Sequence, residues 1–210
     1  MNRKAVTTRD FIWVCTFTFV LGATVHTPLV EAQSRHVQNQ TNAAMPRSEE
    51  ISKLLVVLRD PELRKTQPER VVAAIQRLGE MRATEAVNDL VELLTFARKF
   101  AWERDDAIVE IQPITRGNRY PATSALFQIG RPALPALVKV IELNPTDSEW
   151  AQNSTFAVQN IFRDNLTEGA QYLERAAESS KNTESAQRLR QSAAELRRLE
   201  GQIVKTVTKQ

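Results

Sequence analysis

Apolar residues recur three or four positions apart through most of the chain from Ser48 onward. This spacing places them on one face of an α-helix. The first run follows Ser48, the expected N-cap, and its apolar residues are Ile51, Leu54, Leu55 and Leu58. Asp60 precedes Pro61 and is expected to end this helix, because a residue before proline is disfavoured in the α region. Pro68 stands where the next helix can begin.

A short pattern of small and apolar residues then repeats along the chain. The three copies are AIQRLG at 74–79, ALFQIG at 125–130 and AVQNI at 157–161. A second apolar stretch follows each copy, at 86–94, 133–141 and 170–177. Each copy, together with the apolar stretch that follows it, is therefore expected to form a helix, a turn and a second helix. Gly79 and Gly130 are expected in the left-handed conformation that ends a first helix. Pro135 requires one second helix to start near Pro132 or Ala133.

The stretch ALFQIGRPALPALVKVI at 125–141 resembles a HEAT repeat of the bacterial, phycobilisome-lyase-like type. In that type, a helix ending in A-L-x-x-I-G is followed by a short turn, then by alanine, an apolar residue, proline and leucine. AIQRLGEMRATEAVNDLVELL at 74–94 is similar, with Asn88 in place of the usual proline. The resemblance covers about residues 69–178. It implies an all-α fold, a short right-handed α-solenoid of HEAT-like helix pairs.

The small residues of the repeated pattern support this arrangement independently. A lone helix pair cannot bury its apolar face, so pairs of this kind stack with contacts only to their neighbours. Ala74, Ala125 and Ala157 stand where each first helix is expected to approach its partner closely.

The repeats are assigned to residues 48–180, with an insert at 97–120 that lengthens the spacing between the first two copies. Residues 181–210 are expected to form a long amphipathic helix and a tail. Its apolar face is defined by residues seven positions apart, namely Leu189, Leu196 and Ile203. This helix is expected to cap the open end of the solenoid, because terminal repeats need a polar outer face.

The first 32 residues have the order of a secretory signal peptide. Basic residues come first, the uncharged apolar run 11–25 follows, and cleavage is expected after Ala32, with Ala23 as a second possible site. The alternative is an uncleaved anchor in the inner membrane. After cleavage, residues 33–47 would form a flexible polar leader and the protein would be periplasmic or secreted.

Composition excludes several kinds of chemistry. Cleavage would remove the single cysteine and leave one histidine, His36, in the leader, so no Ser-His-Asp or Cys-His site is expected. Asp105, Asp106 and Glu110 are interpreted as a solvated charged face, because the Asp/Asn–Gly pattern of a calcium loop is missing. No catalytic, cofactor-binding or metal-binding residue is therefore assigned. A net charge of +3 is too small to indicate a nucleic-acid partner.

The insert supplies the candidate partner-binding residues, Trp102, Arg116, Arg119 and Tyr120. Aromatic and arginine side chains on a loop are common anchors of protein interfaces. The alternative is that Phe100 and Trp102 fold back to cover the core and that Tyr120 packs at the start of a helix. The expected function is a non-catalytic scaffold that binds another protein. The resemblance also allows a bilin lyase-like enzyme or accessory factor. The basic C-terminal helix allows a structural role at a membrane surface, although membrane contact beyond the export signal is not expected.

Overall fold

The computed structural model describes residues 46–98 and 115–207, with side chains up to residue 203. The proposed signal peptide, most of the leader, Trp102 and the three insert carboxylates lie outside these ranges. Within them, every regular element is helical and no strand occurs. In chain order the elements are α1 Arg47–Arg59, α2 Pro61–Thr66, α3 Pro68–Glu80, η1 Thr84–Ala86, α4 Val87–Val91, α5 Arg116–Arg119, α6 Pro121–Ile129, η3 Arg131–Ala133, α7 Leu134–Leu143, α8 Glu149–Ile161, α9 Leu166–Ser179 and α10 Thr183–Val207.

The helix boundaries near the start of the described chain follow proline and aspartate. The prediction that Ser48 is the N-cap of α1 was wrong, because Pro46 occupies that position and its carbonyl accepts the first backbone N–H groups. Asp60 ends α1 as predicted and also caps α2, since its carboxylate accepts the Glu62 N–H at 2.8 Å. Pro68 begins α3, also as predicted.

The two glycines of the repeated pattern have different roles. Gly130 ends α6 with a φ of 85°, a backbone conformation that favours glycine. The same prediction for Gly79 was wrong, because α3 continues through it to Glu80. The positive φ falls instead on Arg82, at 49°, where the Ala83 N–H closes the helix end by donating to the Leu78 carbonyl at 3.0 Å.

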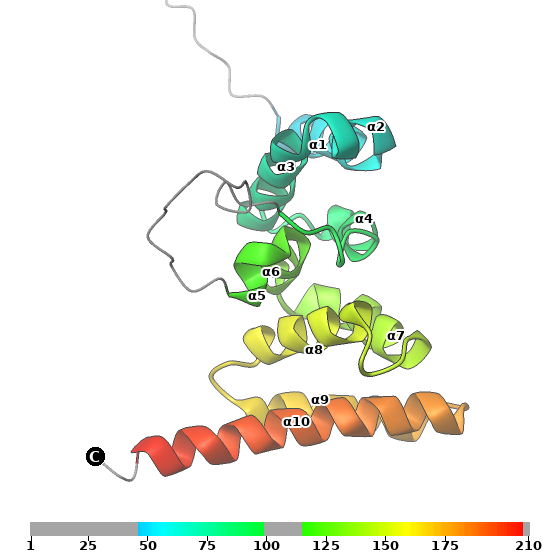
Figure 1. The fold of residues 1–210 in the computed structure, drawn as a ribbon, viewed down its shortest axis with the longest axis vertical. Helices are drawn as coiled ribbons and strands as arrows, with labels where there is room; N and C mark the ends of the chain where they lie inside the picture. The colour runs from blue at the N-terminus through cyan, green and yellow to red at the C-terminus, as the bar shows by residue number, and fades with distance from the viewer. Residues whose placement is uncertain (1–45, 99–114, 208–210) are drawn as a thin grey trace, which may run out of the picture. The chain divides into compact units, whose positions relative to one another are not determined.

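Helices that are distant in sequence pack in succession. α3 lies against α6, and α6 lies against α8. Of the second helices, α4 lies against α7, and α7 in turn lies against the C-terminal helix α10 (Figure 1). One continuous apolar core runs through these contacts, and its largest fully buried side chains include Leu58, Ile75, Leu78, Leu90, Leu126, Leu137, Ile141, Leu173, Leu189 and Leu196.

Gly79 permits the close approach of α3 to α6. A Cβ atom on Gly79 would lie 2.8 Å from the Cα atom of Ala125 and 2.5 Å from Oε1 of Gln128. The first of these neighbours is backbone and cannot move without shifting α6. Ala125 belongs to this contact, as predicted for it, whereas Ala74 is buried but lines the groove between α1 and α3.

The second helices differ in regularity. The stretch 133–141 forms η3 and α7, so the start near Ala133 is confirmed. The stretch 86–94 contains only the five α-helical residues of α4, because the N–H groups of Leu93 and Leu94 bond to carbonyls three residues back. The third pair also departs from expectation, since α9 packs mainly against α10 and only slightly against α8.

α10 is the long amphipathic helix that the sequence predicts. Leu189 and Leu196 are fully buried, but the prediction that Ile203 shares their buried face was wrong, because its side chain is 55% exposed. Thr167, near the start of α9, contacts Glu200, so α10 extends past the end of its partner helix. No described helix is long and apolar enough to cross a membrane.

We expect Gly79→Ala to destabilise the protein, although alanine is the better helix former by about 1 kcal/mol. The new methyl group would overlap the backbone of α6, and overpacking of this kind costs about 1–3 kcal/mol. Chemical denaturation measures the loss. The matched control is Gly201→Ala in α10, where no atom lies within 4 Å, and this variant should be slightly stabilised. Equal effects in the two variants would contradict the close approach.

Candidate functional site

The described end of the insert is attached firmly to the helices around it. Thr115 caps α5, and the Arg98 N–H donates to the Arg119 carbonyl at 2.8 Å, so the chain enters and leaves the insert at neighbouring points. Gly117 is buried, and a Cβ atom there would lie 2.7 Å from Oγ of Ser124. Residues 115–120 are therefore part of the packed structure.

Arg116, one of the predicted partner-binding residues, contacts α8. Its Nη1 donates to Oδ1 of Asn153 at 2.7 Å, and its Nη2 donates to Oε1 of Gln152 at 2.9 Å. The guanidinium group also lies 5.9 Å from the centre of the Tyr120 ring. Both hydrogen-bond partners are neutral, so they fix the position of the Arg116 charge without neutralising it.

Tyr120, another predicted partner-binding residue, is buried. Its hydroxyl donates to Oε1 of Glu149 at 2.7 Å. This hydrogen bond, together with burial, raises the pKa of Tyr120 above its usual value, and the nearby Arg119 opposes the shift. The neutral phenol is therefore favoured in the folded protein. The pair contributes to stability below the ordinary tyrosine pKa, and the contribution is lost as the pH rises through the raised pKa.

Asn153 joins three parts of the chain and was missed by sequence reasoning. Its side chain is fully buried, its Nδ2 donates to the Leu94 carbonyl at 2.6 Å, and its Oδ1 accepts from Arg116. It therefore connects the segment after α4 to α8 and α5. No sequence pattern marks it, because its role depends on partners that are distant along the chain.

The predicted partner residues thus have unequal access to solvent. Arg119 is exposed at the end of the insert, Arg116 is half-buried, and Tyr120 is buried. Trp102 lies outside the described residues. The structure brings Arg116 and Tyr120 together by packing them against α8, which is the alternative that the sequence left open for aromatic residues of the insert.

A polar hollow of about 220 Å³ adjoins the Arg116 contacts. Four parts of the chain meet there: α5, the connection before α8, α8 itself and α10. The hollow is lined by Arg116, Thr146, Gln152, Thr155, Phe156, Gln159 and Glu195. At its wall, Thr155 and Ser192 are joined by a hydrogen bond of 3.0 Å between α8 and α10.

An apolar groove of about 700 Å³ runs between α4 and α7. Its apolar side chains are Val91, Ala136, Val140, Leu143 and Trp150, and its polar ones are Asn88, Glu92, Lys139 and Asn144. Leu143 is 66% exposed, which is unusual for so large an apolar side chain in a packed helix pair. We refer to these residues as the α4–α7 groove.

A second groove, of about 650 Å³, lies between α1 and α3. Val56 on its edge is 68% exposed. Its basic residues are largely balanced by carboxylates outside it, since Lys53 pairs with Glu49 and Arg77 pairs with Glu50. The net positive charge of this groove is therefore smaller than its basic lining residues alone would give.

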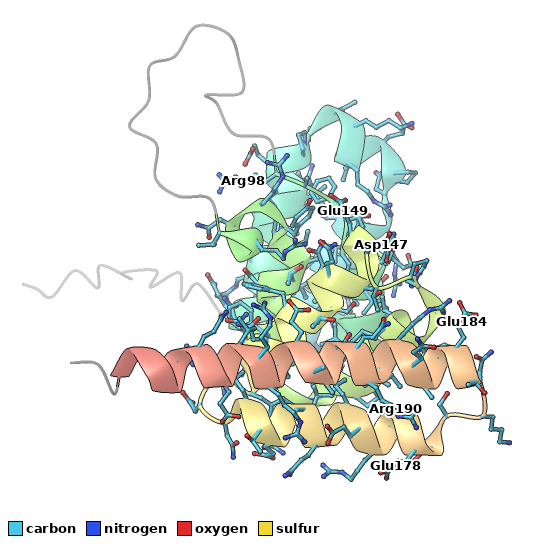
Figure 2. The ribbon with its side chains drawn as sticks, turned by 60° about the horizontal axis from the view of Figure 1, so that its bottom comes forward. Arg98, Asp147, Glu149, Glu178, Glu184 and Arg190 are labelled. Atoms are coloured by element: carbon cyan, nitrogen blue, oxygen red, sulfur yellow. The ribbon has the colours of Figure 1, made fainter. Side chains whose placement is uncertain are left out.

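The basic residues of the C-terminal segment are partly neutralised as well. Arg197 forms two hydrogen bonds to the carboxylate of Glu174, which lowers the pKa of that carboxyl, and Arg188 pairs with Glu184. Figure 2 shows α10 lying along α9, with Glu184 near its first turn. Within the described ranges, no group of three or more histidine, cysteine or acidic residues is placed to hold a metal ion.

We expect Asn153→Ala to lower the free energy of unfolding by about 1–3 kcal/mol, because it leaves the Leu94 carbonyl without its partner in a buried place. Urea denaturation measures this loss. The matched control is Gln152→Ala, which removes the other acceptor of Arg116 from an exposed position and should cost less. A larger loss of unfolding free energy in Gln152→Ala would mean that Asn153 is not the main connection of α8 to α5 and to the segment after α4.

No family model matches this chain, and no curated protein or solved structure matches it. The resemblance to HEAT repeats therefore rests on the residues of the repeated pattern alone.

Proposed function

We propose that the chain is a short right-handed α-solenoid of HEAT-like helix pairs that binds another protein and has no catalytic role. The order of packing supports this proposal. α3, α6 and α8 succeed one another as first helices, and α4 and α7 succeed one another as second helices. A stack of this kind exposes a continuous face along each row of helices, and such faces serve repeat proteins as extended binding surfaces.

The observation that carries the proposal is the α4–α7 groove. It lies between two second helices and is lined by both apolar and polar side chains, which is the mixed composition of a protein interface. Trp150 stands at its side, and tryptophan is enriched among the residues that dominate binding energy. In this proposal the groove lies on the concave face of the solenoid.

The insert would add a second contact. Arg119 is exposed beside the helices that hold Arg116 and Tyr120 in place, so the base of the insert is a fixed platform next to α8. Loops held on a rigid scaffold frequently carry binding residues. The signal-peptide pattern of residues 1–32 supports a location in the periplasm or outside the cell.

We expect Leu143→Asp to weaken partner capture from the native cell envelope at least tenfold. Burial of a leucine side chain contributes about 1.5–3 kcal/mol, and each 1.4 kcal/mol corresponds to a factor of about ten in affinity. The measurement is crosslinking capture with the native protein and the variant as baits, followed by quantification of the captured protein.

The matched control is Ile203→Asp, which places the same charge on an exposed apolar position of α10. It should capture as much partner as the native protein does. A further bait with residues 99–114 replaced by a Gly/Ser linker tests the insert while leaving Arg116 in place. Undiminished capture by Leu143→Asp would exclude the groove, and no reproducible capture by the native protein would contradict the scaffold role.

A further inference from the structure

The polar hollow beside α8 contains a positive charge that is held in place but not neutralised. Arg116 is half-buried, and both of its hydrogen-bond partners are side-chain amides. Within the described residues, no carboxylate forms an ion pair with it. A guanidinium group has five N–H donors, and these contacts use two of them. Arg116 therefore keeps donors and charge for an anionic group, and carboxylates match its geometry well.

A negative charge lines the same hollow from a different helix. Glu195 lies on α10, and it forms no ion pair with Arg116 or with any other described cation. The two opposite charges thus line one hollow without forming an ion pair with each other. Gln159, a half-buried residue of α8, also lines the hollow, and its side-chain amide can both donate and accept hydrogen bonds. Phe156 adds an apolar wall.

The dimensions restrict what fits. The hollow has a volume of about 220 Å³, whereas sites for drug-sized ligands have about 300–1,000 Å³. It is also more enclosed than a surface groove, because three helices and the connection before α8 surround it. A ligand must therefore be small, and one that carries both an anionic and a cationic group can contact Arg116 and Glu195 at the same time.

We propose that this hollow binds a free α-amino acid. The carboxylate of the ligand contacts Arg116, and its ammonium group contacts Glu195. The small side chain lies against Phe156. This binding site goes beyond the scaffold function and does not depend on it, because the hollow and the α4–α7 groove share no residue.

Isothermal titration calorimetry with the full chain tests the proposal directly. The probes are the common free L-amino acids, each with its N-acetyl derivative and its carboxamide. At least one free amino acid should bind. Its N-acetyl derivative, which lacks the ammonium charge, and its carboxamide, which lacks the carboxylate, should each bind at least tenfold more weakly. Absence of binding by every free amino acid at millimolar concentration would overturn the proposal.

Two variants separate recognition from folding. Glu195→Gln changes an exposed residue and should leave the fold intact. It should weaken binding of the free amino acid at least tenfold, and it should remove the preference for the free amino acid over its N-acetyl derivative. The matched control is Glu178→Gln, on the outer side of α9 in Figure 2, which should bind like the native protein. A preference that survives in Glu195→Gln would overturn the assigned contact.

Discussion

The close approach of α3 to α6 is the constraint on which the other contacts of this fold depend. Gly79 has no Cβ atom, and the Cα atom of Ala125 occupies the space that a Cβ would need. This contact fixes the distance between two successive first helices. The same spacing lets Leu78 and Leu126 share one core, so a larger residue at the contact would loosen both the helix pair and the apolar interior.

The stacking also determines where the surfaces lie. The first helices α3 and α6 meet closely at Gly79 and Ala125, whereas the second helices α4 and α7 leave a groove that holds Leu143 at the surface. At the other side of the stack, α5 is held to α8 by Asn153, and this attachment positions Arg116 at the edge of the polar hollow. The proposed protein-binding groove and the proposed amino-acid site are thus two consequences of one helix arrangement.

Much of the helical organisation could be predicted because its signals are local. Pro68 begins α3 and Gly130 ends α6, each through the backbone preference of a single residue. Gly79 was misinterpreted because its role depends on α6, which is distant in sequence. Ile203 continued the heptad spacing correctly but had no partner to cover it, since α9 begins too late. Sequence periodicity identifies an apolar face, and only the tertiary structure shows where that face is covered.

The candidate site was predicted less completely than the fold. Arg116 and Tyr120 were selected as residues of an exposed loop, yet both contact α8 and its neighbours. These contacts could not be read from the sequence, because the partner residues lie about thirty residues or more away along the chain. The buried amide of Asn153 gave no distinctive pattern, because its importance comes from the Leu94 carbonyl and Arg116 that it joins.

The central claim is that the helix pairs form a stack held together mainly by contacts between successive pairs, with the hydrogen bond from Asn153 to the Leu94 carbonyl as an exception. Native-state hydrogen exchange in a Leu58→Ala variant tests it most directly, because Leu58 is buried in α1 at one end of the stack and its truncation costs about 2–5 kcal/mol. In a nearest-neighbour stack, amides of α1 to α4 exchange faster and those of α9 and α10 keep their native rates. Equal acceleration in α9 and α10 would contradict the account, since it would require one indivisible cooperative unit.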